Sequence, residues 1–268
     1  MLAFSATNAM AGLVTVLPSD LGSPGDLNTW YLTNYRTTPT YSSTTVAEIS
    51  NSNPRSGNGS VEMSLTDGSG KADFQYVWGY NSNRTLGNLT ALGLDWYRDS
   101  TSTNPSAQAP ALRMFYDADG DSGTTADTGY LIWEYTYTNG TPPTDSWITS
   151  NAIGDNFWMR MFASGTTIEL FDKDLSEWAT GSPFTDGANN ISDTLSDSTA
   201  ILGIDFGIGS GWNGEFLGYV DNVTFGFSNE EQMTFNFETA GNVPEPATLL
   251  LMGLGLAGMG CRRRRIAA

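Results

Sequence analysis

The amino-acid sequence predicts an all-β protein, an antiparallel β-sandwich followed by a C-terminal hydrophobic helix. Hydrophobic and polar residues alternate in short runs along most of the chain, which is the pattern of half-buried antiparallel strands. Clusters of Gly, Asn, Asp, Ser and Pro separate these runs, as turns do. A third feature, an apolar and uncharged stretch at residues 247–261, is long enough for a helix.

The alternating runs begin at Val14 and predict about eleven or twelve strands, a number that suggests two curved sheets in jelly-roll topology. We expect them to form one domain over residues 12–242. Residues 50–60, 101–110 and 182–198 have loop composition, and residues 173–179 are expected to form one short surface helix. The runs are Val61/Met63/Leu65, Phe74/Tyr76/Trp78/Tyr80, Leu92/Leu94/Trp96, Leu112/Met114/Tyr116, Leu131/Trp133/Tyr135/Tyr137, Phe157/Met159/Met161, Ile168/Leu170, Leu202/Ile204/Phe206/Ile208, Val223/Phe225/Phe227 and Met233/Phe235/Phe237.

Two strands in the second half of the chain carry a resemblance. They read GYLIWE from Gly129 to Glu134 and GYVDNVT from Gly218 to Thr224. In these segments the body resembles concanavalin-like and carbohydrate-binding jelly rolls. The resemblance implies a sandwich fold and supplies no catalytic motif.

Charge and composition exclude several classes of function. The chain has 12 basic and 29 acidic residues, and without residues 244–268 it keeps 8 basic and 28 acidic residues, a formal charge of −20. Such a polyanion repels nucleic acid, so we expect no nucleic-acid partner. The chain has no histidine, and its only cysteine is Cys261, which removes histidine-based triads, Cys-His dyads and His-ligated zinc.

The N-terminal segment predicts export. Ala9-Met10-Ala11 has the small-x-small form of a signal-peptidase site, with cleavage after Ala11. We therefore interpret residues 1–11 as the remnant of a signal peptide. A disordered native N-terminus is the alternative.

The C-terminal segment, residues 243–268, has three parts in a fixed order. Val243, Pro244, Glu245 and Pro246 form a stiff, extended start, because proline fixes φ and disfavours helix in the preceding residue. The apolar run follows, and Arg262, Arg263, Arg264 and Arg265 end it. A basic cluster after an apolar run stays on the cytoplasmic side of a membrane.

This three-part segment resembles the PEP-CTERM sorting signal of Gram-negative, exopolysaccharide-producing bacteria. The resemblance implies recognition by an exosortase in the inner membrane, removal of the tail near Pro-Glu-Pro and delivery to the surface or matrix. It also implies that Pro244 to Pro246 are recognised, that residues 249–259 span the membrane transiently and that the arginines retain the end. The alternative is an ordinary single-pass anchor, although the run is shorter than the roughly 20 apolar residues of a comfortable span.

One loop is dense in carboxylates. Asp117, Asp119, Asp121 and Asp127 lie between a strand that ends at Tyr116 and one that starts at Tyr130. Carboxylates spaced around glycines are able to wrap Ca²⁺, which takes six to eight oxygens at flexible geometry. The alternative is a solvated hairpin in which Asp and Gly make the turn.

Other residues carry hypotheses about binding and catalysis. Trp212 lies in a Gly- and Asn-rich loop and is the candidate for an exposed ring that stacks on a sugar. Alternation places Asp221 on the inward face of its strand, where it would accept backbone N–H groups or ligate a metal. It places Asp205 on a solvated face.

A glycosidase needs two carboxylates across the scissile bond. Candidates are Glu134, Glu169 and Asp172, and the strand motif Glu-x-Asp-x-x-Glu is missing.

The sequence therefore predicts an exported, non-enzymatic protein of the cell surface or extracellular matrix of a Gram-negative bacterium. Its expected partners are an exosortase and, transiently, the inner membrane. An extracellular polysaccharide is the hypothetical ligand, on fold analogy. The acidic loop suggests Ca²⁺ as a cofactor, and the sequence indicates no other. A purely structural matrix component and a glycoside hydrolase are the alternatives.

Overall fold

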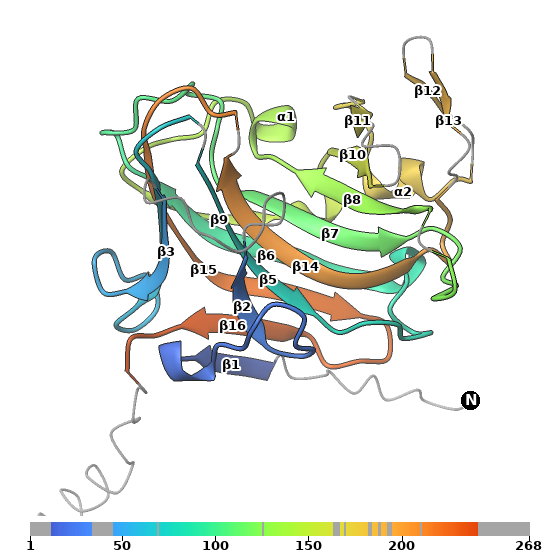
Figure 1. Ribbon diagram of the computed structural model, residues 1–268, viewed down its shortest axis with the longest axis horizontal. Coiled ribbons are helices and arrows are strands. Elements are labelled where there is room, and N and C mark those ends of the chain that lie inside the picture. Colours follow the sequence, from blue (N-terminus) through green and yellow to red (C-terminus); the bar gives the residue numbers. More distant parts are fainter. Residues whose placement is uncertain are drawn as a thin grey trace, which may run out of the picture.

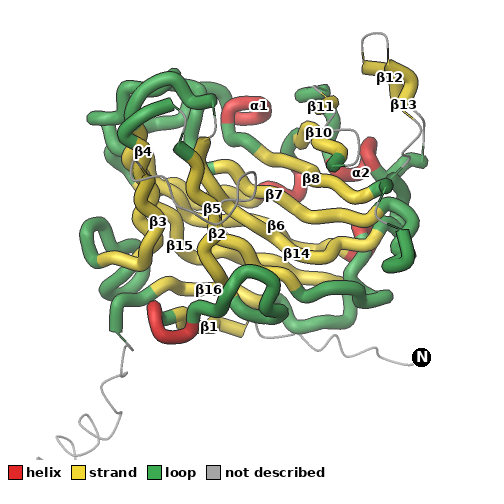
Figure 2. The backbone as a smooth tube through the Cα atoms, viewed as in Figure 1, coloured by secondary structure: helices red, strands yellow, loops and turns green. Residues whose placement is uncertain are grey.

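The computed structural model describes residues 12–33, 45–68, 70–124, 126–162, 167–168, 170–181, 184–186, 189–191, 195–209 and 211–240. These residues form two seven-stranded sheets and one small two-stranded sheet (Figure 1). Strands dominate and the helices are short (Figure 2). The predicted β-sandwich is confirmed, whereas the predicted signal-peptide remnant and C-terminal helix lie outside the described residues.

The first sheet has the strand order β1-β16-β15-β4-β3, and the long strand β15 also pairs with β6, which pairs with β9. All these pairs are antiparallel except β1 with β16, which is parallel. The strands are β1 (Gly12–Val16), β3 (Thr45–Ser50), β4 (Ser60–Leu65), β6 (Leu89–Arg98), β9 (Trp147–Asn151), β15 (Phe216–Phe227) and β16 (Met233–Phe237).

The second sheet has the order β11-β10-β8-β7-β14-β5-β2 and is antiparallel throughout. Its strands are β2 (Trp30–Thr33), β5 (Lys71–Val77), β7 (Ala111–Asp117), β8 (Thr128–Trp133), β10 (Phe157–Met161), β11 (Thr167–Ile168) and β14 (Ala200–Gly209). The chain crosses between the sheets at β1 to β2, β2 to β3, β4 to β5, β5 to β6, β6 to β7, β8 to β9, β9 to β10 and β14 to β15. Repeated crossing of this kind is jelly-roll topology.

The main core lies between the two sheets and is rich in aromatic rings. Trp30 of β2 meets Phe235 and Phe237 of β16 edge-on, with ring centroids 5.4 and 5.3 Å apart. Trp78, directly after β5, packs 4.8 Å from Phe225 of β15. Such tilted and edge-on pairs add to the stabilisation from buried area. The predicted alternation is confirmed here, because the inward residues of these strands are buried.

The short elements agree with the sequence only in part. The predicted helix at 173–179 contains α2 (Leu175–Trp178), whose N-cap Asp174 accepts a hydrogen bond from the backbone N–H of Glu177. It is less superficial than expected, because Trp178 is buried. The expectation of a pure loop at 182–198 is wrong, since β12 (Phe184–Asp186) and β13 (Asn189–Ile191) pair there as a hairpin. The remaining short helices are α1 (Thr136–Asn139), η1 (Pro18–Asp20), η2 (Leu86–Asn88) and η3 (Ala152–Gly154).

Within the described part of the chain, no helix combines the length and apolar character needed to cross a membrane. The predicted transient span at 249–259 is outside that part.

The prediction that Asp205 is solvated is wrong. Its side chain does lie on the outer face of the second sheet, but it is only 1% exposed. Arg113, its cross-strand neighbour on β7, donates a 2.6 Å hydrogen bond to it and another 2.6 Å bond to Asp73 of β5. Alternation assigns a side chain to one face of a sheet and does not show whether other side chains cover that face.

Glycine makes room for these buried ions. Gly207 on β14 is directly opposite Asp73 on β5 and Ala111 on β7. A Cβ atom at this position would overlap the carboxylate of Asp73 and lie 2.9 Å from Nη1 of Arg113. A side chain at 207 is therefore incompatible with the present ion pairs.

We expect Gly207→Ala to lower the free energy of unfolding by about 1–3 kcal/mol, the usual effect of overpacking. Denaturant titration measures it. The matched control is Gly154→Ala in η3, where a Cβ meets nothing within 4 Å, so its effect should stay within about 0.5 kcal/mol. Equal stability of the two variants would show that the outer face tolerates a methyl group and that the ion pairs do not depend on this glycine.

Candidate functional site

A pocket of about 290 Å³ lies on the outer face of the second sheet, on the side away from the main core. Strands β5, β7, β8, β10 and β14 contribute to it, together with residues that directly follow β8 and β10 and with Trp212 in the loop between β14 and β15. We call it the aromatic pocket. Its lining residues are Lys71, Ala111, Arg113, Tyr130, Ile132, Glu134, Trp158, Arg160, Phe162, Gly209 and Trp212.

Strand register places the floor of the pocket. Arg113 of β7 is opposite Ile132 of β8, and Ile132 is opposite Trp158 of β10. In the neighbouring row Tyr130 of β8 is opposite Arg160 of β10. Because side chains two residues apart share a face, Trp158 and Arg160 point to the same side of β10.

Aromatic rings form the apolar part of this face. Phe115, Tyr130 and Phe162 pack together with ring centroids 4.8 to 5.8 Å apart. They belong to a small hydrophobic cluster, separate from the main core, that includes the half-buried Trp158. Half-buried aromatic rings beside charged groups are typical of the lining of ligand pockets.

A buried ion network lies beside these rings. Arg113 is hydrogen-bonded to both Asp73 and Asp205, and Nζ of Lys71 lies 2.7 Å from Oδ2 of Asp73. All four side chains are at most 9% exposed. Two cations thus face two carboxylates, which offsets the cost of burying each charge.

The pKa values of the network reflect burial and partners. Burial raises the pKa of Asp205 to about 6, although Arg113 favours the ionised form. Burial lowers the pKa of Lys71, and Arg113 adds to this effect while Asp73 opposes it. For Arg113, burial alone would lower the pKa, but Asp205 and Asp73 together raise it above its ordinary value. The arginine therefore stays charged and holds the two carboxylates together.

Glu134, directly after β8, contributes a carboxylate to the pocket. Burial raises its pKa, and both Arg113 and a hydrogen bond with Tyr137 oppose that shift. Of the other hydrolase candidates, Asp172 is exposed and is not part of the pocket lining, and Glu169 lies outside the described residues. The structure does not bring Glu134 and Asp172 together in this pocket.

Trp212 is placed differently from the expectation of an exposed ring. It is 7% exposed and packs edge-on against Phe216, with centroids 5.1 Å apart. Gly211 donates a backbone hydrogen bond to Gly68, and Gly68 has room for no side chain next to Trp212. The loop is thus closed against the β4–β5 turn, and Trp212 reaches only the wall of the aromatic pocket.

Sequence reasoning did not select Trp158, because a tryptophan inside a strand is usually a core residue. The pattern did contain the information. Phe157, Met159 and Met161 take the core-facing positions of β10, so Trp158 and Arg160 must occupy the opposite face.

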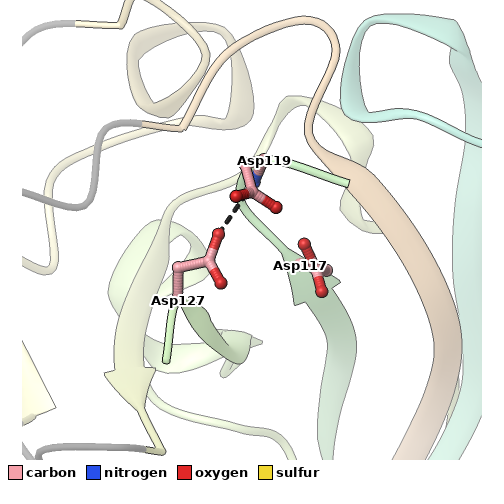
Figure 3. A group of neighbouring side chains, drawn as sticks. All are labelled: Asp117, Asp119 and Asp127. Carbon is pink, nitrogen blue, oxygen red and sulfur yellow. Dashed lines mark hydrogen bonds between the residues drawn. The ribbon is translucent and has the colours of Figure 1, made fainter. Parts of the chain in front are cut away.

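Three of the four predicted metal ligands lie together. Asp117, Asp119 and Asp127 each offer a carboxylate oxygen, and these oxygens lie within 4.8 Å of one another (Figure 3). Asp121 is not in this group, and its carboxylate accepts a hydrogen bond from the backbone N–H of Gly123. If Ca²⁺ binds, Asp117, Asp119 and Asp127 are the side chains that would hold it.

The same carboxylates also make the turn. Asp117 accepts hydrogen bonds from the backbone of Gly120 and from the hydroxyl of Tyr80, and Asp127 accepts one from the backbone of Asp119. Burial raises the pKa of Asp117, while the bond from Tyr80 opposes the rise. The hydrogen bonds fit the turn interpretation, and calcium binding stays a prediction.

Asp221 of β15 is fully buried, as alternation predicts. Its carboxylate accepts hydrogen bonds from the backbone N–H groups of Phe237 and Ser56, at 2.9 and 3.3 Å. Burial raises its pKa to about 7, and these bonds limit the shift. The predicted role as an acceptor of backbone N–H groups is confirmed.

The residues of the sorting tail, from Val243 onward, lie outside the described part of the chain. Residues 242–265 match the model of the PEP-CTERM protein-sorting motif. The motif marks an exported protein that is processed by an exosortase and sorted to the cell surface or extracellular space. No curated protein matches the chain.

Several solved structures are similar to this chain. One is the family 11 carbohydrate-binding module from Clostridium thermocellum in complex with a β-1,3-1,4-mixed-linked tetrasaccharide, with 14% identity over 77% of this chain and 93% of that chain and a TM-score of 0.37. Another is the family 11 module of the cellulosomal cellulase Lic26A-Cel5E of the same organism, with 15% identity over 76% and 91% and a TM-score of 0.36. A β-1,2-glucanase from Parabacteroides distasonis has 15% identity over 71% of this chain and 23% of its own, with a TM-score of 0.34.

We expect added Ca²⁺ to raise the melting temperature by about 2 °C or more if the three carboxylates bind it, because a ligand of the native state stabilises that state. EDTA should reverse the shift, and differential scanning calorimetry measures it. Asp119→Asn should abolish the response, while the control Asp121→Asn should keep it. An unchanged melting temperature in the original protein would leave the turn as the whole role of the loop.

Proposed function

We propose that the protein is a non-enzymatic component of the cell surface or extracellular matrix whose β-sandwich binds a polysaccharide in the aromatic pocket. The observation that carries the proposal is the pocket itself. Aromatic side chains of Tyr130, Trp158 and Phe162 lie next to the polar groups of Arg160 and Glu134. A flat ring covers the apolar face of a sugar, while polar groups at its edge pair with hydroxyls.

The size of the pocket suits a short section of a sugar chain. Its volume of about 290 Å³ is near the lower end of the ~300–1,000 Å³ range of ligand pockets. It is open along the face of a sheet, and long polymers bind on open faces more readily than in closed cavities. The floor of the pocket consists of residues in paired strands, so little ordering is required on binding.

The sorting motif suggests a role for polysaccharide binding. Removal of the tail near Pro-Glu-Pro would separate the released body from the predicted transient span at 249–259. A protein of formal charge −20 does not adhere to an anionic surface by charge alone. Binding to a polysaccharide would then retain it at the outer surface of a Gram-negative cell or in the surrounding matrix.

The charges in the pocket favour binding over hydrolysis. A glycosidase requires an acid and a second carboxylate about 5 to 9.5 Å apart across the bond. Glu134 is the single carboxylate among the described lining residues, and the nearby Asp73 and Asp205 are tied to Lys71 and Arg113. These two carboxylates are buried and already paired, so they do not provide Glu134 with a second carboxylate in the pocket lining.

Polysaccharide pull-down and isothermal titration calorimetry test the proposal. We expect Trp158→Ala to weaken binding about tenfold or more, because loss of a central aromatic anchor costs ~1–2 kcal/mol or more. The matched control is Trp147→Ala, which removes a half-buried tryptophan from β9 in the other sheet. Affinity unchanged in Trp158→Ala would place any glycan elsewhere, and failure to bind any polysaccharide would favour a purely structural matrix component.

A further inference from the structure

The aromatic pocket concentrates positive charge in a chain that has little of it. Only 8 basic residues precede residue 244, and three of them, Lys71, Arg113 and Arg160, line this one pocket. The same stretch holds 28 acidic residues, yet Glu134 is the only one among the described lining residues. The positive charge of the pocket is therefore not a consequence of the overall composition. It results from the placement of these three basic residues in one pocket.

Two of these three cations are already neutralised. Lys71 and Arg113 face Asp73 and Asp205 in the buried network, and their side chains are 7% and 9% exposed. They set the polarity of the pocket floor but have little capacity for a further anion. Among the described lining residues, Arg160 is therefore the cation that no described carboxylate neutralises.

Arg160 differs from the other arginines that the structure describes. Arg55 pairs with Asp95, Arg84 with Glu230 and Arg113 with two aspartates, while Arg98 donates to Asn104 and Gln108. Within the described ranges, the guanidinium of Arg160 has neither an ion pair nor a hydrogen bond from its side chain. It is half-buried on β10, where a guanidinium gains from a partner because it has lost part of its water shell.

The position of Arg160 is fixed relative to the rings. It lies directly opposite Tyr130 in the β8–β10 pair and two residues after Trp158 on the same face. A sugar ring that rests on Trp158 would thus extend toward the guanidinium. The planar fork of arginine binds a carboxylate through two parallel hydrogen bonds, a geometry that neutral hydroxyls do not offer.

We infer that the pocket recognises an acidic polysaccharide and that Arg160 binds the carboxylate of a uronate residue in it. This inference rests on the proposed polysaccharide binding and names the chemical class of the sugar. Glu134 then accepts hydrogen bonds from hydroxyl groups of the ligand, and the neutralised Lys71, Asp73, Arg113 and Asp205 network leaves Arg160 to set the charge preference. No bond is made or broken.

Because of the net charge of the protein, specific binding of an acidic polysaccharide can be distinguished from nonspecific electrostatic attraction. A body of formal charge −20 repels polyanions at long range. Binding of a polyuronate would therefore require a specific cationic site. At about 0.15 M salt the Debye length is ≈ 8 Å, so dissolved ions screen most of the long-range repulsion. The contacts within the pocket are screened much less.

The experiment compares two acidic probes, polygalacturonate and alginate, with two neutral probes, dextran and mixed-linked β-glucan. Titration calorimetry on the exported protein at about 0.15 M salt measures each affinity. We expect the acidic probes to bind about tenfold or more tightly than the neutral ones, and Arg160→Gln to remove that preference. Arg160→Lys should retain part of it. The matched control Arg55→Gln removes the same charge from the loop between β3 and β4, where Arg55 pairs with Asp95 of the other sheet, and should change nothing.

The outcomes distinguish the two proposals. Equal binding of neutral and acidic probes, or an acidic preference that survives Arg160→Gln, would overturn the uronate assignment while Trp158→Ala still supports the pocket as the binding site. Absence of binding to all four probes, with circular dichroism showing a folded protein, would overturn this inference. If Trp158→Ala binds every probe as the original protein does, the pocket is not the site, and both proposals fail.

Discussion

The outer face of the second sheet depends on one arginine. Arg113 reaches across β14 to bind Asp73 and Asp205, and it stands beside Lys71 in a network that is almost completely buried. Removing one member would leave a buried charge without its partner, a change that typically costs 3–5 kcal/mol in other proteins. Gly207 provides the space for this contact. The network keeps the face polar at its centre, whereas the opposite face of the same strands is hydrophobic.

The two faces explain how one sheet supports both folding and binding. On β10, Phe157, Met159 and Met161 enter the core, and Trp158 and Arg160 enter the pocket. The alternation that makes a strand half-buried thus supplies a row of outward side chains without removing any residue from the core. The sorting motif at 242–265 is separate from this row in the sequence and marks the protein for processing by an exosortase. The chain therefore separates the residues that determine its destination from the residues proposed to act there.

Much of the fold could be predicted because the alternation of hydrophobic and polar residues indicates which face of its strand each residue occupies. The core strands and the inward carboxylate of Asp221 follow directly from it. The burial of Asp205 could not be predicted in this way. It depends on Arg113, which lies on another strand and is ninety-two residues away in sequence. The expectation of an exposed ring at Trp212 is also wrong. Composition suggested that the loop of Trp212 was open, but a backbone hydrogen bond to Gly68 closes it, while Trp158 lies in a strand and reaches the pocket. In the acidic loop, the spacing of the aspartates does not show which of them lie together. The carboxylate of Asp121 accepts a hydrogen bond from the backbone of Gly123, and the group consists of Asp117, Asp119 and Asp127.

The most direct test is a crystal structure of the protein with a bound oligogalacturonate. We expect a sugar ring against Trp158 and a uronate carboxylate within about 3 Å of the guanidinium of Arg160. A second groove, lined by residues of β6, β9 and β15 on the other sheet, offers the sugar another place to bind. An oligosaccharide in that groove, with the aromatic pocket empty, would contradict the account.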